Sequence, residues 1–438
     1  MIRPTNASGA WLLLSWSVWL GLSGAAQAQE VERETALVGA TIHQGAGPGG
    51  TVVLSAGKIR AIGKVELTAN TRVVDLKGAH LYPGLIDADT VLGLTEIGSV
   101  KGTQDTREVG LINPNLRAER AVNPDSILFP VARTGGVLFA HVAPRSGWIA
   151  GTSALIYTAG QTYEEMTVRA PVFLHVRWPK MRIAKQGQTA EQIKKASAAR
   201  EAALAGIRGA FREARSYSKA RRVINGTRPR DPKWEAMLPL VRAPLGAPKV
   251  RVAVHAETQA QIEAALDWGQ EEGVSLVLVG GADAWRLAER LQKQDVAVIL
   301  GPVQRLPRRA HEAVDTPYRL AARLHQAKVR IAFSTGGSGF QAANARNLRL
   351  HAAQAVAYDL PPEVALHALT QGAADLLGVG DRLGSVRTGR EATLIATDRP
   401  LFEDGAKITH AWIRGRPVSL EDRQSKLYER YRDLRRRR

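Results

Sequence analysis

The sequence predicts an α/β protein: a (β/α)8 TIM barrel with a small β-sandwich domain formed by both ends of the chain. Eight short apolar runs predict the barrel, because they alternate with helical stretches across residues 81–384. Runs that are apolar throughout are typical of parallel strands covered by helices on both faces. Short strand-like segments and glycine turns in residues 29–80 and 385–420 predict the β-domain.

The order of the eight runs gives the expected barrel its layout. A closed barrel gathers the carboxyl ends of its strands at one mouth, and barrel proteins place their sites there. We therefore look for functional residues where these runs end. The predicted strands are Leu81–Ile86, Gly136–His141, Ala154–Tyr157, Pro171–Val176, Val250–His255, Val274–Val279, Val296–Leu300 and Val329–Phe333.

A basic insertion, residues 180–235, separates the fourth run from the fifth. Within it, 190–220 is rich in Ala, Lys and Arg, which predicts one long helix that ends before Asn225-Gly226. Such an insertion would cover the site, dock a partner or remain a solvated decoration. A second basic segment, 421–438, ends in four arginines and is expected to form a terminal helix or a frayed tail.

The first 28 residues predict a secretory signal peptide. Arg3 gives a positive start, Trp11 to Leu22 is largely apolar, and Ala26-Gln27-Ala28 fits a cleavage site. We expect an exported protein, periplasmic or extracellular, with no transmembrane segment after cleavage. The sequence contains no cysteine, which excludes disulfides and thiolate ligands.

The net charge of +19 is concentrated in the basic insertion and the basic tail. No recognisable nucleic-acid-binding motif accompanies these charges, so we expect no nucleic-acid partner. Electrostatic contact with an anionic envelope surface explains the charge better.

The segment Pro83-Gly84-Leu85-Ile86-Asp87-Ala88-Asp89-Thr90-Val91 resembles a known signature. In the imidazolonepropionase-like branch of the amidohydrolase superfamily, the first strand reads Pro-Gly-hydrophobic-hydrophobic-Asp-x-His-x-His. Residues 252–257 resemble the fifth-strand histidine segment of that family, and 331–337 resemble the eighth-strand segment. The closing helix from Leu360 and the turn within 378–390 are similar as well. The resemblance implies a barrel that carries a metal-dependent hydrolase site.

Most of the metal-ligand positions that the resemblance implies are changed. Asp89 and Val91 stand where the family has its two first-strand histidines. Gly280 stands at the sixth-strand histidine and Gly336 at the eighth-strand aspartate, which serves as ligand and base. The fifth-strand histidine is kept as His255. At the fourth strand, where the family places lysine or glutamate, the sequence offers His175, with Arg177 beyond it.

These losses predict an altered site. A hydrolytic zinc needs three protein ligands and an open position, and one inherited ligand cannot supply them. We therefore expect no metal or other cofactor. The alternative is a divalent cation such as Mg²⁺ or Mn²⁺ held by Asp87, Asp89 and His255. The candidate residues at the mouth are Asp87, Asp89, His255 and Thr335.

Two outcomes are open for the mouth itself. Glycines would widen it into a pocket for a small polar ligand. These glycines are Gly280, Gly281, Gly336 and Gly337. The competing outcome is that the long polar loop 96–115 fills it. The loop after the second strand adds Arg145 and Trp148 on the same face.

Three functions remain open. The first is a catalytically altered or inactive homologue that binds a small ligand or supports a partner, such as an active amidohydrolase. The second is an active hydrolase of carbon–nitrogen bonds other than peptide bonds, in amides or cyclic amides, with a rebuilt metal site. The third is a basic, envelope-associated scaffold protein. The resemblance also implies a homodimer.

Overall fold

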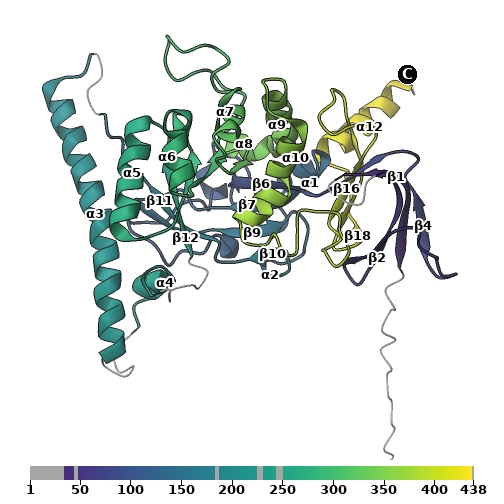
Figure 1. The fold of residues 1–438 in the computed structure, drawn as a ribbon, viewed down its shortest axis with the longest axis horizontal. Coiled ribbons are helices and arrows are strands. Elements are labelled where there is room, and N and C mark those ends of the chain that lie inside the picture. Colours follow the sequence, from purple (N-terminus) through teal and green to yellow (C-terminus); the bar gives the residue numbers. More distant parts are fainter. Residues whose placement is uncertain (1–33, 44–47, 183–186, 224–229, 243–249, 437–438) are drawn as a thin grey trace, which may run out of the picture. The chain divides into compact units, whose positions relative to one another are not determined.

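The computed structural model describes residues 34–43, 48–182, 187–223, 230–242 and 250–436. The predicted signal peptide, residues 1–28, lies outside these ranges. The described chain has a mixed α/β fold in which strands and helices alternate through most of its length (Figure 1). No helix in the described ranges is both long and apolar enough to cross a bilayer.

An eight-stranded sheet is built from both ends of the chain. Its strand order is β18-β17-β16-β5-β1-β2-β3, with β4 paired to β1. The two chain ends meet where Leu394 of β16 lies opposite Pro83 of β5. Buried apolar residues, among them Leu37, Leu81 and Trp412, form a separate core for this sheet. The strands are β1 (Thr35–Ile42), β2 (Pro48–Ser55), β3 (Lys58–Gly63), β4 (Arg72–Asp75), β5 (His80–Pro83), β16 (Leu394–Thr397), β17 (Ile408–Ile413) and β18 (Arg416–Pro417).

The eight apolar runs all contain strands, but their hydrogen bonds form two sheets rather than the single closed barrel that the sequence predicts. One sheet has the order β10-β9-β7-β6 and the other β15-β14-β13-β12-β11-β8. A parallel bridge between Thr90 and Gly336 links the two sheets, and backbone hydrogen bonds join Ser153 to Phe173 and to Val172. The strands are β6 (Leu85–Thr90), β7 (Val137–Val142), β8 (Ile149–Thr152), β9 (Ala154–Tyr157), β10 (Thr167–Arg169), β11 (Phe173–Arg177), β12 (Arg251–Ala256), β13 (Leu276–Gly280), β14 (Ala297–Leu300) and β15 (Ile331–Phe333).

The third predicted strand, Ala154–Tyr157, is not parallel to its neighbours as the sequence predicts. β9 pairs antiparallel with β7, and the preceding β8 pairs antiparallel with β11. Residues 143–148, which connect β7 to β8, explain the reversal. A parallel return needs a crossover of about a dozen residues or more, usually a helix, and this connection is too short for one.

Helices pack along the sheets in chain order, and Figure 1 shows α5, α6, α7, α9 and α10 following one another. α5 begins with a capping box between Thr258 and Gln261 and ends at Gly273, whose φ of 64° suits glycine. The helices are α1 (Leu128–Thr134), α2 (Tyr163–Met166), α3 (Ala190–Val223), α4 (Pro232–Val241), α5 (Gln259–Glu272), α6 (Ala288–Lys293), α7 (Leu320–Gln326), α8 (Gly339–Ala343), α9 (Leu348–Val356), α10 (Pro362–Leu369), α11 (Gln371–Leu376) and α12 (Arg423–Arg436).

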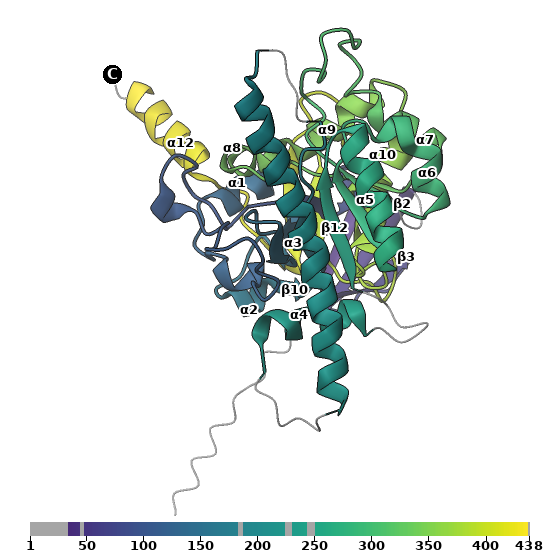
Figure 2. The same ribbon diagram turned by 90° about the vertical axis from the view of Figure 1, so that its left-hand side faces the viewer.

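The long helix predicted in the basic insertion is confirmed as α3, and it is more than a solvated decoration (Figure 2). Phe211 of α3 is fully buried and meets Trp268 of α5 edge-to-face, with ring centroids 5.1 Å apart. Gly206 lets the ring of Trp148 approach, because a Cβ there would lie 2.1 Å from that ring. α3 therefore covers α5 and the loop that precedes β8.

Candidate functional site

Three strand ends bring together the donor atoms of Asp89, His175 and His255. They lie at the carboxyl ends of β6, β11 and β12, and one donor atom from each falls within 4.8 Å of the others. Nδ1 of His175 lies 2.9 Å from Nε2 of His255, so one of the two rings donates a hydrogen bond to the other. The sequence predicted Asp89 and His255 at this mouth, and the structure adds His175 to them.

A buried arginine occupies the same place. Nη2 of Arg145 lies 2.9 Å from Oδ1 of Asp89, and the two side chains are 9% and 4% exposed. Gly337 makes room for the guanidinium, because a Cβ on that residue would lie 2.1 Å from its central carbon. In the described part of the chain, the buried Nε of Arg145 and Nε2 of His175 have no hydrogen-bond partner, whereas Nη2 of Arg145 lies in the ion pair with Asp89.

This arrangement does not fit a divalent cation as it stands. The three donor atoms are close enough to hold one, but the guanidinium already neutralises the carboxylate that the cation would need. Two positive charges that share one buried oxygen repel each other strongly. A metal on Asp89, His175 and His255 therefore requires Arg145 to move away.

Three histidines near the ion pair of Arg145 with Asp89 are neutral near pH 7. Burial lowers the pKa of His175 and of His255 well below the usual value, and the charge of Arg145 lowers both further. Burial also lowers the pKa of His141 to about 4. His141 donates from Nδ1 to the carbonyl oxygen of Ala88 over 2.6 Å, so its Nε2 accepts from the hydroxyl of Ser153 over 2.7 Å. His141 thus links Ala88 to Ser153 in the interior, whereas His175 and His255 lie beside Asp89.

Asp87 lies beside this cluster but is engaged elsewhere. It is fully buried, and burial raises its pKa to about 7. The backbone N–H of Thr335 donates to Oδ1 of Asp87 over 2.9 Å, and the Thr335 hydroxyl donates to Oδ2. The structure therefore brings the predicted residues Asp87 and Thr335 together as a tie between β6 and the end of β15. The alternative metal set loses Asp87 from its ligands and has His175 in its place.

The glycines at the former ligand positions do not widen the mouth, so that expectation was wrong. A Cβ at Gly280 would lie 2.3 Å from a carboxylate oxygen of Glu257, and one at Gly336 would lie 2.8 Å from the Gln341 side chain. Neighbouring side chains fill the space that a histidine or an aspartate would take. Both glycines also have a φ of +95°, a conformation that other residues rarely adopt.

The polar loop 96–115 fixes the segment that carries Arg145. The backbone N–H of Arg145 donates to the carbonyl of Thr106 over 2.8 Å, and that of Trp148 donates to Leu111 over 2.7 Å. The N–H of Asn113 in turn donates to Ile149 over 2.9 Å. The loop thus runs beside 145–149 and sets the position from which Arg145 reaches Asp89.

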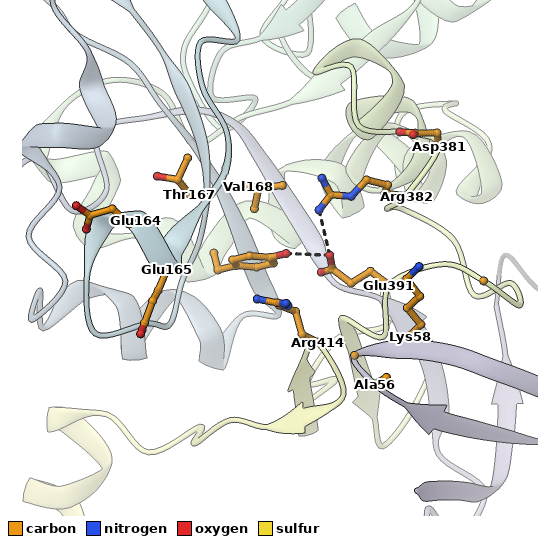
Figure 3. Close-up of a pocket in the computed structure, with 13 residues that line it drawn as sticks. Ala56, Lys58, Glu164, Glu165, Thr167, Val168, Asp381, Arg382, Glu391 and Arg414 are labelled. Carbon is orange, nitrogen blue, oxygen red and sulfur yellow. Dashed lines mark hydrogen bonds and ion pairs between the residues drawn. The ribbon is translucent and has the colours of Figure 1, made fainter. Parts of the chain in front are cut away.

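A separate cavity of about 400 Å³ lies away from this mouth (Figure 3). The hydroxyl of Tyr157 donates to Glu391 over 2.8 Å, and Thr393 donates to the same carboxylate over 2.7 Å. Burial raises the pKa of Tyr157, so it stays protonated. In Figure 3, Arg382 also points toward Glu391. This network is internally paired and contains none of the predicted site residues.

Comparisons with known proteins agree with this fold. The model of the amidohydrolase family matches residues 250–418. Amidohydrolase tasK of Hapsidospora irregularis is 23% identical over 381 residues, which cover 80% of this chain and 37% of that protein. The chain thus spans little more than a third of this curated relative.

Solved structures are similar over nearly the whole described chain. An amidohydrolase from Thermotoga maritima MSB8 superimposes with a TM-score of 0.77 at 23% identity, covering 88% of this chain and 99% of its own. A prolidase complexed with N-methylphosphonate-L-proline gives a TM-score of 0.52 at 17% identity, with coverage of 88% and 99%. The fold of the described chain is that of solved amidohydrolase structures. Residues 250–418 match the amidohydrolase family.

Proposed function

We propose that this protein is an amidohydrolase homologue that has lost metal-dependent hydrolysis and binds a small anionic ligand at the mouth formed by its strand ends. The observation that carries the proposal is the buried ion pair of Arg145 with Asp89. It puts a fixed cation beside the carboxylate that a metal would need. Gly336, at the position of the family's acid–base aspartate, has no side chain to move a proton.

The charges around the ion pair favour an anion as the ligand. Nε and Nη2 form one edge of the Arg145 guanidinium; Nη2 lies in the ion pair with Asp89, and the buried Nε has no hydrogen-bond partner in the described structure. Nε is therefore a donor that an anionic ligand can use while Nη2 stays with Asp89. Burial lowers the pKa of Arg177, and the positive charges of Arg145 and Arg107 lower it further. The positive charges of Arg107 and Arg177 thus add to that of Arg145, whereas Asp89 is already paired.

Two measurements test this proposal together. Elemental analysis of protein purified in the presence of zinc should find no stoichiometric metal. Thermal shift and calorimetry should show binding of N-acetylglycine but not of N-acetylglycinamide, which has the same shape without the charge. Arg177→Gln should weaken the binding of N-acetylglycine by about tenfold or more. Arg387→Gln, on an exposed turn of the closing segment, is the matched control and should bind like the wild type.

A second candidate function is supported by the donor cluster itself. If Arg145 withdraws, Asp89, His175 and His255 would hold a divalent cation, which would supply an activated water for hydrolysis of non-peptide carbon–nitrogen bonds. One tightly held metal ion per wild-type chain, with amide hydrolysis that a chelator abolishes, would replace the first proposal with this one.

Four further expectations accompany the proposal. We infer that the two sheets act as one barrel that contains the eight predicted strands, supported by the bridge between Thr90 and Gly336. We also propose export, on the basis of the leader-like residues 1–28, and membership of the imidazolonepropionase-like branch. A homodimer is expected by resemblance, and light scattering of the purified chain tests it.

A further inference from the structure

We infer that the C-terminal helix α12 binds the surface of a membrane that contains anionic lipids. The inference is independent of the proposed function, because it rests on a different part of the molecule. α12 spans Arg423–Arg436 and projects away from the other helices (Figure 2). Three features carry the inference: an anchored start, an exposed apolar stripe and an excess of cations.

The start of α12 is fixed to the body of the protein. Oδ1 of Asp422 accepts from the N–H of Ser425 over 2.7 Å, and the Ser425 hydroxyl accepts from the N–H of Asp422 over 3.0 Å. Before the helix, Nε of Arg133 donates to the carbonyl of Ser419 over 3.0 Å, and Leu420 packs against the main core. The direction in which α12 leaves the body is therefore defined.

Most of the described side chains of α12 are exposed, among them its large apolar ones. Leu427 is 36% exposed, Tyr428 64%, Tyr431 60% and Leu434 49%. Residues 427, 431 and 434 follow the i, i+4, i+7 spacing that places them on one side of a helix, and Tyr428 adjoins them. These four residues form the apolar stripe. A 14-residue helix whose apolar side chains are exposed is marginal in water, so a surface that covers the stripe would stabilise it.

The charge of α12 and the residues after it indicates which kind of surface covers the apolar stripe. Residues 423–438 contain lysine or arginine at 423, 426, 430, 432 and 435–438, against two acids, Glu429 and Asp433. The ring of Tyr428 also lies 5.7 Å from the guanidinium of Arg432. Leucine and tyrosine beside arginine and lysine are what helices that lie in a membrane interface present to lipid. Anionic headgroups attract such a helix, and the attraction is screened by salt.

Flotation with lipid vesicles tests the inference on the full-length protein. Wild type should bind vesicles that contain about one-third phosphatidylglycerol and bind phosphatidylcholine vesicles far more weakly. High salt should release much of the bound protein. The double substitution Leu427→Ser and Tyr431→Ser should lower binding to the anionic vesicles by about tenfold or more. Phe340→Ser, which removes an apolar side chain that is 79% exposed outside α12, should leave binding unchanged.

Folding and self-association are controlled separately. The stripe residues are exposed, so the double substitution should leave the thermal midpoint of the body unchanged. Equal vesicle binding by the wild type and the stripe variant would overturn the inference. So would a dimer in lipid-free buffer that the stripe variant abolishes, because a second copy of the chain would then be what covers α12.

Discussion

The guanidinium of Arg145 and the carboxylate of Asp89 form a buried ion pair, with Nη2 of Arg145 2.9 Å from Oδ1 of Asp89. The pair lies among the donor atoms that a metal would use, and Arg145 comes from a loop rather than from a strand end. The guanidinium of Arg145 thus occupies the place at which the superfamily resemblance implies a bound metal ion. This relationship leads to the first two predictions.

Arg145→Met should create a metal site. Removal of the guanidinium frees Asp89 to act as a ligand with His175 and His255, and methionine retains most of the apolar stem. We expect the variant to bind Co²⁺ with visible absorption bands, whereas the wild type gives none. The same variant with His255→Ala is the control and should lose the bands. Bands of equal intensity in the wild type would show that Arg145 does not block the site.

Separating the ion pair should destabilise the protein. Both side chains are less than 10% exposed, so either single change, Asp89→Ala or Arg145→Ala, leaves a buried charge without its partner. Each should lower the free energy of unfolding by about 3–5 kcal/mol, and the double variant should lose clearly less than the sum. Urea unfolding of the four proteins measures this coupling. Additive losses would mean that the two charges stabilise the fold independently.

Gly280→Ala should lower the free energy of unfolding more than Gly389→Ala does. Gly280 and Gly389 both have a positive φ, +95° and +85°, but only Gly280 has a carboxylate 2.3 Å from the added Cβ. Gly389→Ala should therefore lose about 1 kcal/mol through backbone strain alone. Gly280→Ala should lose about 1–3 kcal/mol more, most of which Glu257→Ala should restore in the double variant. Equal losses of unfolding free energy in the two single variants would show that the Glu257 side chain moves aside at little cost.

His351 should make the protein sensitive to acid. Burial in α9 lowers the pKa of His351 to about 4 from its ordinary 6.5, so the folded state holds this side chain neutral. Between these two values the unfolded chain binds a proton that the folded protein does not, so stability falls as the pH drops from about 6.5 to 4. The loss from this residue is on the order of 3 kcal/mol. In urea unfolding at several pH values, His351→Leu should have a shallower slope than the wild type, and an unchanged slope would assign the sensitivity to other groups.

The sequence predicted the strands well, because the signal for each strand is local. Each of the eight apolar runs contains a strand, and the long helix of the basic insertion is present. The direction of β9 was missed, because the apolar run Ala-Leu-Ile-Tyr fits a parallel strand as well as an antiparallel one. Only the short connection between Val142 and Ile149 indicates an antiparallel return.

The site was predicted in part, and the misses were contacts between residues far apart in the sequence. Asp89 and His255 followed from the resemblance of their segments to the first and fifth strands of the amidohydrolase family. Arg145 was noted as a loop residue, but no spacing pattern links it to Asp89 or to the space above Gly337. The sequence likewise shows that Gly280 lacks a side chain, but not that Glu257 fills the vacated space. Packing decides these points, and packing depends on the complete fold.

The sheet shared by both chain ends has a consequence for how the protein is made. The N–H of Leu401 donates to the hydroxyl of Tyr82, 319 positions earlier in the chain, and β16 lies between β5 and β17. While the ribosome is still translating the middle of the chain, β5 therefore has an edge that nothing in the nascent polypeptide can cover. Contacts this distant form slowly, and an uncovered strand edge invites pairing with other chains. A chain released before residue 394 would lack β16 and would keep that edge, so premature termination should yield aggregates rather than a smaller folded protein.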